Sequence, residues 1–189
     1  MSVRAMFLDR DGVVNVDTGY VFRRADFRFI DGIFELCRAA TAKGYLVIIV
    51  TNQSGIVRGY FTEDDYRTLT AWMLDRFAAE GVRIADVFHC PSLSGPNRKP
   101  NPGMFLATQR KHGIDMAASV SLGDRMRDVE AGQLAGVGTN VLFLAKDMNT
   151  DTNRNMATDV GKNDGNRDTD EYGRPDHVIN SLREMEAFL

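Results

Sequence analysis

The chain has 189 residues, of which 23 are Lys or Arg and 26 are Asp or Glu, and its formal net charge is −3. This length is sufficient for one domain with a substantial core. The near balance of charges provides no basic surface for nucleic acid, and no apolar run approaches the roughly 18–20 residues of a membrane span. Charged residues stand near the N-terminus, where a signal peptide needs an apolar run. We therefore expect a cytoplasmic, monomeric domain that binds neither nucleic acid nor membrane.

Short apolar runs alternate with segments of helical periodicity along most of the chain. In chain order, the pattern predicts a strand at 3–8, a helix at 31–43, a strand at 45–50, a helix at 62–80, a strand at 84–90, a helix from 102, a strand at 119–122, a helix at 125–135 and a strand at 139–144. We expect Asp31 to cap the first helix, and Thr62 with Asp65 to open the second in a capping box. Alternation of this kind implies a parallel sheet covered on both faces. The predicted fold is a three-layer, Rossmann-like α/β sandwich.

Residues 147–174 interrupt the alternation, because they are rich in Asp, Asn, Thr and Gly and contain few apolar side chains. Such a segment buries too little surface to offset the entropy of ordering it. We therefore expect a flexible polar insertion at 147–174 within a single domain that spans residues 1–189. After it, residues 177–179 are expected to add an edge strand and residues 181–189 a final helix.

Four of the predicted strand ends are followed by polar motifs. They are DRDG at 9–12, TNQSG at 51–55, RKP at 98–100 and GDRMRD at 123–128. Ligands of an open parallel sheet bind at the carboxyl ends of its strands, so folding would bring these motifs together.

The residue types in these motifs suit a metal ion and a phosphoryl group. The acidic members of the expected cluster are Asp9, Asp11, Asp124 and Asp128. Four carboxylates cannot all ionise side by side without a cation, and oxygen ligands beside a phosphate favour Mg²⁺. Thr51 offers a hydroxyl group and Lys99 a positive charge, so the set suits a phosphoryl group held against a carboxylate nucleophile.

The order DxDG, TN, RKP and GDxxxD over residues 9–128 resembles the haloacid dehalogenase-like (HAD) phosphohydrolase superfamily. The longer segments FLDRDGVVNVDTGYV, TNQSGIVRGYFTEDDY, RKPNPGM and AGVGT are similar to D-glycero-D-manno-heptose 1,7-bisphosphate phosphatases and the related histidinol-phosphate phosphatases. The similarity extends over most of residues 4–144. It implies a HAD-type fold and a Mg²⁺-dependent phosphatase for a small phosphorylated sugar.

The resemblance also implies roles for individual residues. Asp9 would be the nucleophile that forms an aspartyl-phosphate, and Asp11 the general acid and base. The carboxylates of Asp9 and Asp124, with the backbone carbonyl of Asp11, would hold Mg²⁺. Asp128 would orient a metal-bound water rather than bind the metal directly. Thr51 and Lys99 would hold the phosphoryl group and offset its charge.

Further residues are expected to contact the remainder of the substrate: Asp17, Thr18, Gly19, Tyr20, Asn52, Gln53, Ser54, Arg98 and Arg125. The spacing between the motifs leaves room for loops, helices and strands but not for an inserted cap domain. We therefore expect a capless site that is shaped by the loops at 12–30 and 91–98.

The resemblance implies removal of the C7 phosphate from a heptose 1,7-bisphosphate in nucleotide-activated heptose biosynthesis. The sequence departs from the family in one place, because Cys90-Pro91-Ser92 stands where these phosphatases usually begin a zinc loop, and the His and later Cys ligands are missing. We therefore predict that the protein binds no zinc, and that Cys90 is a structural thiol.

Three other functions stay open at this point. One is hydrolysis of histidinol phosphate or another small sugar phosphate. A phospho-accepting receiver domain also places Asp, Thr and Lys at strand ends, but it needs no second acidic residue at the position of Asp11. A binding module without catalysis is the third alternative, and an intact Asp11 argues against it.

Overall fold

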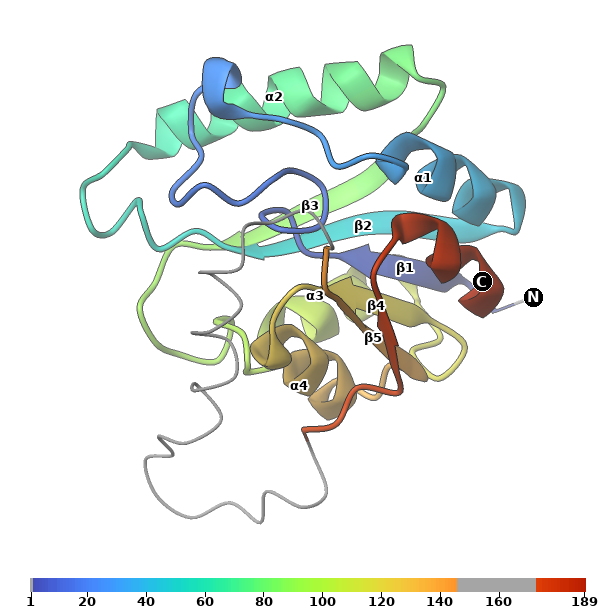
Figure 1. Cartoon of the computed structure of the whole chain (residues 1–189). Helices are drawn as coiled ribbons and strands as arrows, with labels where there is room; N and C mark the ends of the chain where they lie inside the picture. Colours follow the sequence, from blue (N-terminus) through green and yellow to red (C-terminus); the bar gives the residue numbers. More distant parts are fainter. Residues whose placement is uncertain (1, 146–172) are drawn as a thin grey trace.

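The computed structural model describes residues 2–145 and 173–189 (Figure 1). Its elements are β1 (Arg4–Leu8), η1 (Arg24–Asp26), α1 (Ile33–Ala42), β2 (Tyr45–Asn52), α2 (Glu63–Ala79), β3 (Ile84–Cys90), α3 (Gly103–His112), β4 (Val120–Gly123), α4 (Met126–Leu134), β5 (Thr139–Phe143), β6 (His177–Ile179) and η3 (Leu182–Phe188). Each strand predicted from the sequence is present within a few residues of its expected bounds. The insertion predicted at 147–174 lies outside the described residues except at its C-terminal end.

A parallel sheet forms the centre of the fold. Its strand order is β3-β2-β1-β4-β5-β6, and all neighbouring strands are parallel. The chain begins in the middle of the sheet with β1, extends one half through β2 and β3, and then crosses back to β4 to build the other half. The order therefore reverses beside β1, and the carboxyl ends of strands at such a reversal are where α/β sheets bind ligands.

Helices cover both faces of the sheet (Figure 1). On one face, α1, α2 and η3 bury a core that includes Leu36, Phe77 and Met185. On the other, α3 and α4 bury a second core that includes Phe105 and Ala131. This arrangement confirms the three-layer α/β sandwich. It also explains the apolar sequences of the strands, because a strand that is buried on both faces has apolar side chains on both sides.

Of the two N-caps predicted from the sequence, that of α2 is confirmed and that of α1 is wrong. The capping box of α2 is confirmed, since the Thr62 hydroxyl accepts from the Asp65 backbone N–H at 3.0 Å, and the Asp65 carboxylate accepts from the Thr62 backbone N–H at 2.8 Å. Asp31 as the cap of α1 is wrong: Gly32, whose φ of 84° suits glycine, is the N-cap. The final helix predicted at 181–189 is present as the 3-10 helix η3.

The segments between the first strands are short. Between β1 and β2 the chain contains a loop, η1 and α1, and between β2 and β3 it contains a loop and α2. No cap domain is inserted at either place, as the spacing of the motifs predicts. Within residues 2–145 and 173–189, no helix combines the length and the apolarity needed to cross a membrane.

Candidate active site

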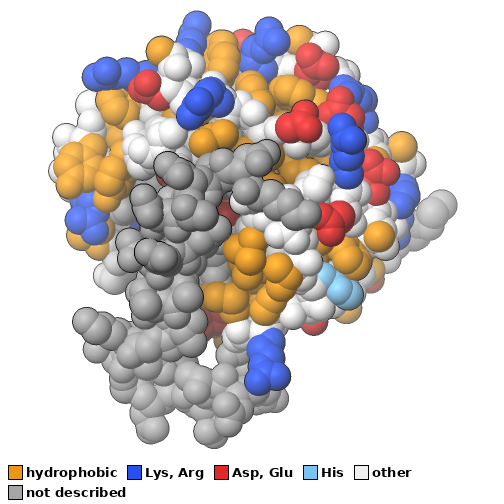
Figure 2. Space-filling model, viewed as in Figure 1, with side chains coloured by type: hydrophobic (Ala, Val, Ile, Leu, Met, Phe, Trp, Pro, Cys, Tyr) orange, Lys and Arg blue, Asp and Glu red, His pale blue; other side chains and the backbone are white. Residues whose placement is uncertain are grey.

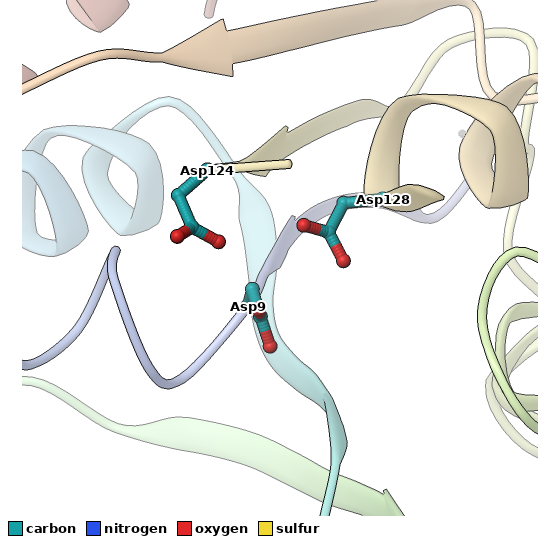
Figure 3. Close-up of side chains that lie close together, drawn as sticks. All are labelled: Asp9, Asp124 and Asp128. Carbon is teal, nitrogen blue, oxygen red and sulfur yellow. The ribbon is translucent and has the colours of Figure 1, made fainter. Parts of the chain in front are cut away.

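Three carboxylates converge where β1 and β4 end (Figure 3). Asp9 follows β1, Asp124 follows β4, and Asp128 lies in the first turn of α4. One oxygen atom from each lies within 4.8 Å of the others. All three residues are buried, with Asp9 the most exposed at 6%. The folded chain therefore brings together three of the four acidic residues expected at this edge.

Burial makes this cluster electrostatically unfavourable without a cation. Burial and the charges of Asp128 and Asp9 raise the pKa of Asp124 well above its ordinary value. Burial also raises the pKa of Asp128, although Lys99 opposes the effect. Among the described residues, Oδ1 of Asp124 is buried without a hydrogen-bond partner. A divalent cation would both bind this oxygen and offset the repulsion, so the oxygen donors present fit Mg²⁺.

Lys99 supplies the positive charge inside the cluster. Its ammonium group lies 3.0 Å from Asp9 Oδ1, 2.7 Å from Asp128 Oδ1 and 2.8 Å from the carbonyl oxygen of Val50. The side chain is almost completely buried. Burial alone would lower the pKa of Lys99, but the carboxylates of Asp128 and Asp9 outweigh it and raise the pKa. Lys99 is therefore a permanent cation beside Asp9.

Two glycines allow the carboxylates to approach the backbone closely. A Cβ atom at Gly12, where φ is 93°, would lie 2.3 Å from Asp124 Oδ2. A Cβ atom at Gly123 would lie 2.2 Å from Cβ of Asp128. Real Cβ atoms do not tolerate such contacts, so the glycines in the DRDG and GDRMRD motifs are required by packing at the site.

The side chain of Asp11 has a different environment. Among the described residues, it is not a member of the three-carboxylate group. Its carboxylate accepts hydrogen bonds from the Arg10 guanidinium at 2.8–3.2 Å, from Asn15 Nδ2 at 3.0 Å and from Gln53 Nε2 at 2.8 Å. Arg10 is fully buried and also donates to the carbonyl oxygen of Val21. Asp11 is thus held beside the cluster by donors from two loops.

The TNQS segment at the end of β2 forms several contacts at the site. Thr51 is buried at the end of the strand. Asn52 donates to the carbonyl oxygen of Lys99 at 3.0 Å and accepts from its backbone N–H at 3.1 Å, which fixes the Lys99 loop against β2. Gln53 is buried and contacts Asp11 and Thr51. Ser54 is partly buried. Two of the expected substrate contacts, Asn52 and Gln53, therefore bond to residues that the sequence predicts to be catalytic.

The loop after β1 borders the cluster. Asp17 accepts from Arg125 Nη2 at 3.2 Å and from the backbone N–H of Gly19 at 2.9 Å, which ties this loop to the start of α4. Thr18 and Gly19 are exposed. Tyr20 has a φ of 51°, and its ring packs edge-to-face on Tyr60 with centroids 4.6 Å apart.

Cationic side chains gather on the same side of the site. Burial and the positive charges of Arg127 and Arg58 lower the pKa of Arg98. The Arg98 guanidinium donates to the carbonyl oxygen of Ser92 at 3.0 Å. In Figure 2, Lys and Arg atoms lie beside hydrophobic side chains over the loop that joins β2 to α2, where Tyr60 is 55% exposed. Within the described residues, none of these three arginines forms a salt bridge.

Reasoning from the sequence did not identify Arg10, Asn15, Arg58 or Arg127 as parts of the site. Arg10 lies between Asp9 and Asp11, and a charged residue between two acids at the end of a buried strand is a signal that could have identified it. Asn15, Arg58 and Arg127 had no such signal, because loop conformation alone brings them here. Cys90, expected as a structural thiol, is buried at the end of β3 and is a free cysteine.

Comparison with known proteins agrees with this geometry. The HAD-hydrolase-like family model matches residues 96–185. The D-glycero-alpha-D-manno-heptose-1,7-bisphosphate 7-phosphatase of Burkholderia mallei is 50% identical over 157 residues, which cover 78% of this chain and 83% of that protein. The D-glycero-beta-D-manno-heptose-1,7-bisphosphate 7-phosphatase of Vibrio cholerae is 44% identical over 170 residues, which cover 85% of this chain and 91% of that protein.

A solved structure supports the same relationship. The D,D-heptose 1,7-bisphosphate phosphatase of B. bronchiseptica, complexed with magnesium and phosphate, matches with a TM-score of 0.77 and 27% identity. The match covers 98% of this chain and 97% of that one. With the carboxylate cluster, the buried lysine and the parallel sheet, these similarities show that the chain is a phosphoric monoester hydrolase and belongs to the HAD family of heptose bisphosphate phosphatases.

Proposed function

We propose that this enzyme removes the C7 phosphate from D-glycero-D-manno-heptose 1,7-bisphosphate, with Mg²⁺ and through an aspartyl-phosphate. The observation that supports it most strongly is the contact between Asp9 and Lys99 within the carboxylate cluster, where Lys99 also donates to the carbonyl oxygen of Val50, the residue before Thr51. The names of the similar phosphatases point to the substrate. The product would keep a phosphate at C1, the group that a nucleotidyltransferase needs.

Asp9 is prepared for nucleophilic attack by its contacts. Its Oδ1 atom accepts from the backbone N–H of Arg10 at 2.8 Å and lies 3.0 Å from the Lys99 ammonium group. These contacts fix the orientation of the carboxylate, which leaves Oδ2 for attack on phosphorus. Lys99 and the Thr51 hydroxyl would hold the phosphoryl oxygens as negative charge develops on them.

The reaction has two balanced steps. In the first, Asp9 forms a bond to phosphorus, the bond from phosphorus to the sugar oxygen breaks, and Asp11 in its acid form gives its proton to that oxygen. In the second, the Asp11 carboxylate takes a proton from water, the water oxygen bonds to phosphorus, and the bond from phosphorus to Asp9 breaks. Phosphate leaves and both carboxyl groups return to their starting state.

The hydrogen-bond and ion-pair partners of the carboxylate oxygens distinguish Asp124 from Asp128 as a metal ligand. Asp128 accepts from the backbone N–H of Arg125 at 3.1 Å through Oδ2, and its Oδ1 forms an ion pair with Lys99 at 2.7 Å. Among the described residues, neither Oδ1 of Asp128 nor Oδ1 of Asp124 has a hydrogen-bond partner, but only that of Asp128 has a cation at ion-pair distance. We therefore assign Mg²⁺ to Asp9, Asp124 and the carbonyl oxygen of Asp11, with Asp128 orienting a coordinated water. When bound, Mg²⁺ would neutralise charge on the phosphoryl group and the carboxylates.

We propose that the second phosphate of the substrate binds near Arg98, Arg127 and Arg58. The pKa of Arg98 is lowered by burial and by the other two guanidinium groups, and a dianion would relieve that repulsion. Arginine forms paired hydrogen bonds to phosphate oxygens, which suits recognition of a second phosphate better than lysine does. We further propose that the enzyme acts as a monomer in the cytoplasm.

The test is phosphate release from a panel of substrates with Mg²⁺ and with EDTA. The panel contains both anomers of the heptose 1,7-bisphosphate, fructose 1,6-bisphosphate and histidinol phosphate. We expect Mg²⁺-dependent release that is fastest with a heptose bisphosphate, and none above background in Asp9→Asn. Faster release from histidinol phosphate would replace the substrate assignment, and activity in Asp9→Asn would contradict the mechanism.

A further inference from the structure

Gln53 lies between two groups that the reaction needs. Its Nε2 atom is 2.8 Å from Asp11 Oδ2 and 3.0 Å from Thr51 Oγ1. The side chain is 3% exposed, and the backbone N–H donates to the carbonyl oxygen of Cys90 at 2.7 Å. The residue is therefore fixed by its own backbone, so the position of its amide group does not depend on the substrate.

The chemistry of the two partners fixes the orientation of the amide. Oδ2 of Asp11 accepts at this contact, so the NH₂ group of Gln53, rather than its oxygen, faces Asp11. The second proton of the same NH₂ group reaches Thr51, whose hydroxyl oxygen then acts as an acceptor toward Gln53. The hydroxyl proton of Thr51 must point elsewhere, and no acceptor for it is found in the part of the chain that the structure describes.

We propose that Gln53 is a positioning residue that aligns both Asp11 and Thr51 for phosphoryl transfer. One amide proton holds the Asp11 carboxyl group where it can reach the leaving sugar oxygen. The other occupies a lone pair of Thr51, so that the hydroxyl proton of Thr51 is directed to a phosphoryl oxygen. The inference rests on the proposed phosphatase function and assigns Gln53 a role other than direct substrate contact.

The hydrogen bond from Gln53 to Asp11 and the hydrogen bond from Gln53 to Thr51 should matter to different extents for different substrates. A sugar alkoxide is a poor leaving group and needs the proton from Asp11, whereas p-nitrophenolate leaves readily without one. The bond from Thr51 to the phosphoryl group is needed for both substrates. Loss of Gln53 should therefore reduce hydrolysis of a sugar phosphate more than hydrolysis of p-nitrophenyl phosphate.

The variant Gln53→Met keeps the length of the side chain and removes both amide donors. We expect kcat for the heptose bisphosphate to fall about 10- to 100-fold, with a smaller fall for p-nitrophenyl phosphate and little change in KM for either. Gln109→Met is the matched control, because Gln109 lies on α3 away from the site. It should leave both rates unchanged. Thermal unfolding of each variant reports whether the fold is intact.

A double-mutant cycle separates the Thr51 contribution. If Gln53 acts on p-nitrophenyl phosphate only through Thr51, then Gln53→Met should have no further effect on this substrate in a Thr51→Val background. Gln53→Glu provides a second variant of nearly the same shape, and it should show the same preference for losing sugar-phosphate activity.

Equal falls for the two substrates would overturn the inference, whether or not the melting temperature also falls, because a structural role does not distinguish leaving groups. Unchanged rates in both variants would overturn it as well. The proposed function is judged separately by the wild-type turnover of the heptose bisphosphate. An inactive wild type would overturn both, whereas an active wild type with uniform variant losses would overturn only the role of Gln53.

Discussion

Replacement of Lys99 by methionine tests the electrostatic balance of the site. Lys99 is the buried cation that touches Asp9 at 3.0 Å and Asp128 at 2.7 Å. Methionine has a similar length but no charge, so Lys99→Met leaves the buried carboxylates without their nearest partner. In the wild type, burial, together with the smaller effect of repulsion between the carboxylates, raises the pKa of Asp124 and of Asp128.

The expected size of the effect follows from this burial. Removing one partner of a buried ion pair costs about 3–5 kcal/mol of unfolding free energy, because the remaining charge has no compensation. For a protein of this length, that cost corresponds to a fall of roughly 6–20 °C in melting temperature. Loss of the charge beside the phosphoryl group should also lower kcat about 10²- to 10³-fold.

The assay is thermal unfolding with EDTA and with Mg²⁺, together with phosphate release. We expect Mg²⁺ to stabilise Lys99→Met more than the wild type, because the ion offsets the same uncompensated charge. Lys111→Met is the control, since Lys111 is 59% exposed and pairs with Asp86 at the surface, where an ion pair contributes about 1 kcal/mol or less. A Lys99→Met protein with wild-type melting temperature and activity would refute this account of the cluster.

Four further predictions concern individual residues and the metal content. Gly12→Ala should lower both activity and Mg²⁺ affinity, measured by titration calorimetry. Gly59 also has a positive φ, but no atom lies within 4 Å of the place of an added Cβ, so Gly59→Ala should affect the protein only through backbone strain. Asp124→Asn removes a carboxylate whose pKa is raised. It should therefore raise the melting temperature of the metal-free protein while abolishing turnover, and an unchanged melting temperature would count against the repulsion. Burial raises the pKa of Cys37 to about 12. The folded state thus favours the thiol form of Cys37. The contribution of this group to the free energy of unfolding is fully present below the ordinary thiol pKa and is lost as pH rises toward 12. Mass spectrometry should find Cys37 unmodified by iodoacetamide in the folded protein at neutral pH. Separately, elemental analysis should find no stoichiometric zinc.

Much of the fold was predictable because buried parallel strands leave a simple pattern. Apolar runs of strand length, separated by helices of clear periodicity, predicted each strand of the sheet. The capping box at Thr62 was also visible, because its two partners are three residues apart. Asp31 failed as a cap because the competing signal, Gly32 in a left-handed conformation, depends on how the preceding loop enters the helix.

The site was predictable to the extent that its residues follow strand ends. Asp9, Thr51 and Asp124 are placed by the sheet itself, so their proximity follows from strand order. The direct partnership between Lys99 and Asp128 could not be read from spacing, because it depends on where the RKP loop returns over the sheet. The same holds for the donors to Asp11, since Arg10, Asn15 and Gln53 reach it only through loop geometry.

The most direct test of the central claim is phosphorus NMR of the heptose 1,7-bisphosphate during turnover with Mg²⁺. We expect the C7 phosphomonoester signal to disappear and free phosphate to appear in equal amount, while the C1 signal remains. Asp9→Asn should leave both substrate signals intact. Loss of the C1 signal first, or loss of either signal in Asp9→Asn, would contradict the claim.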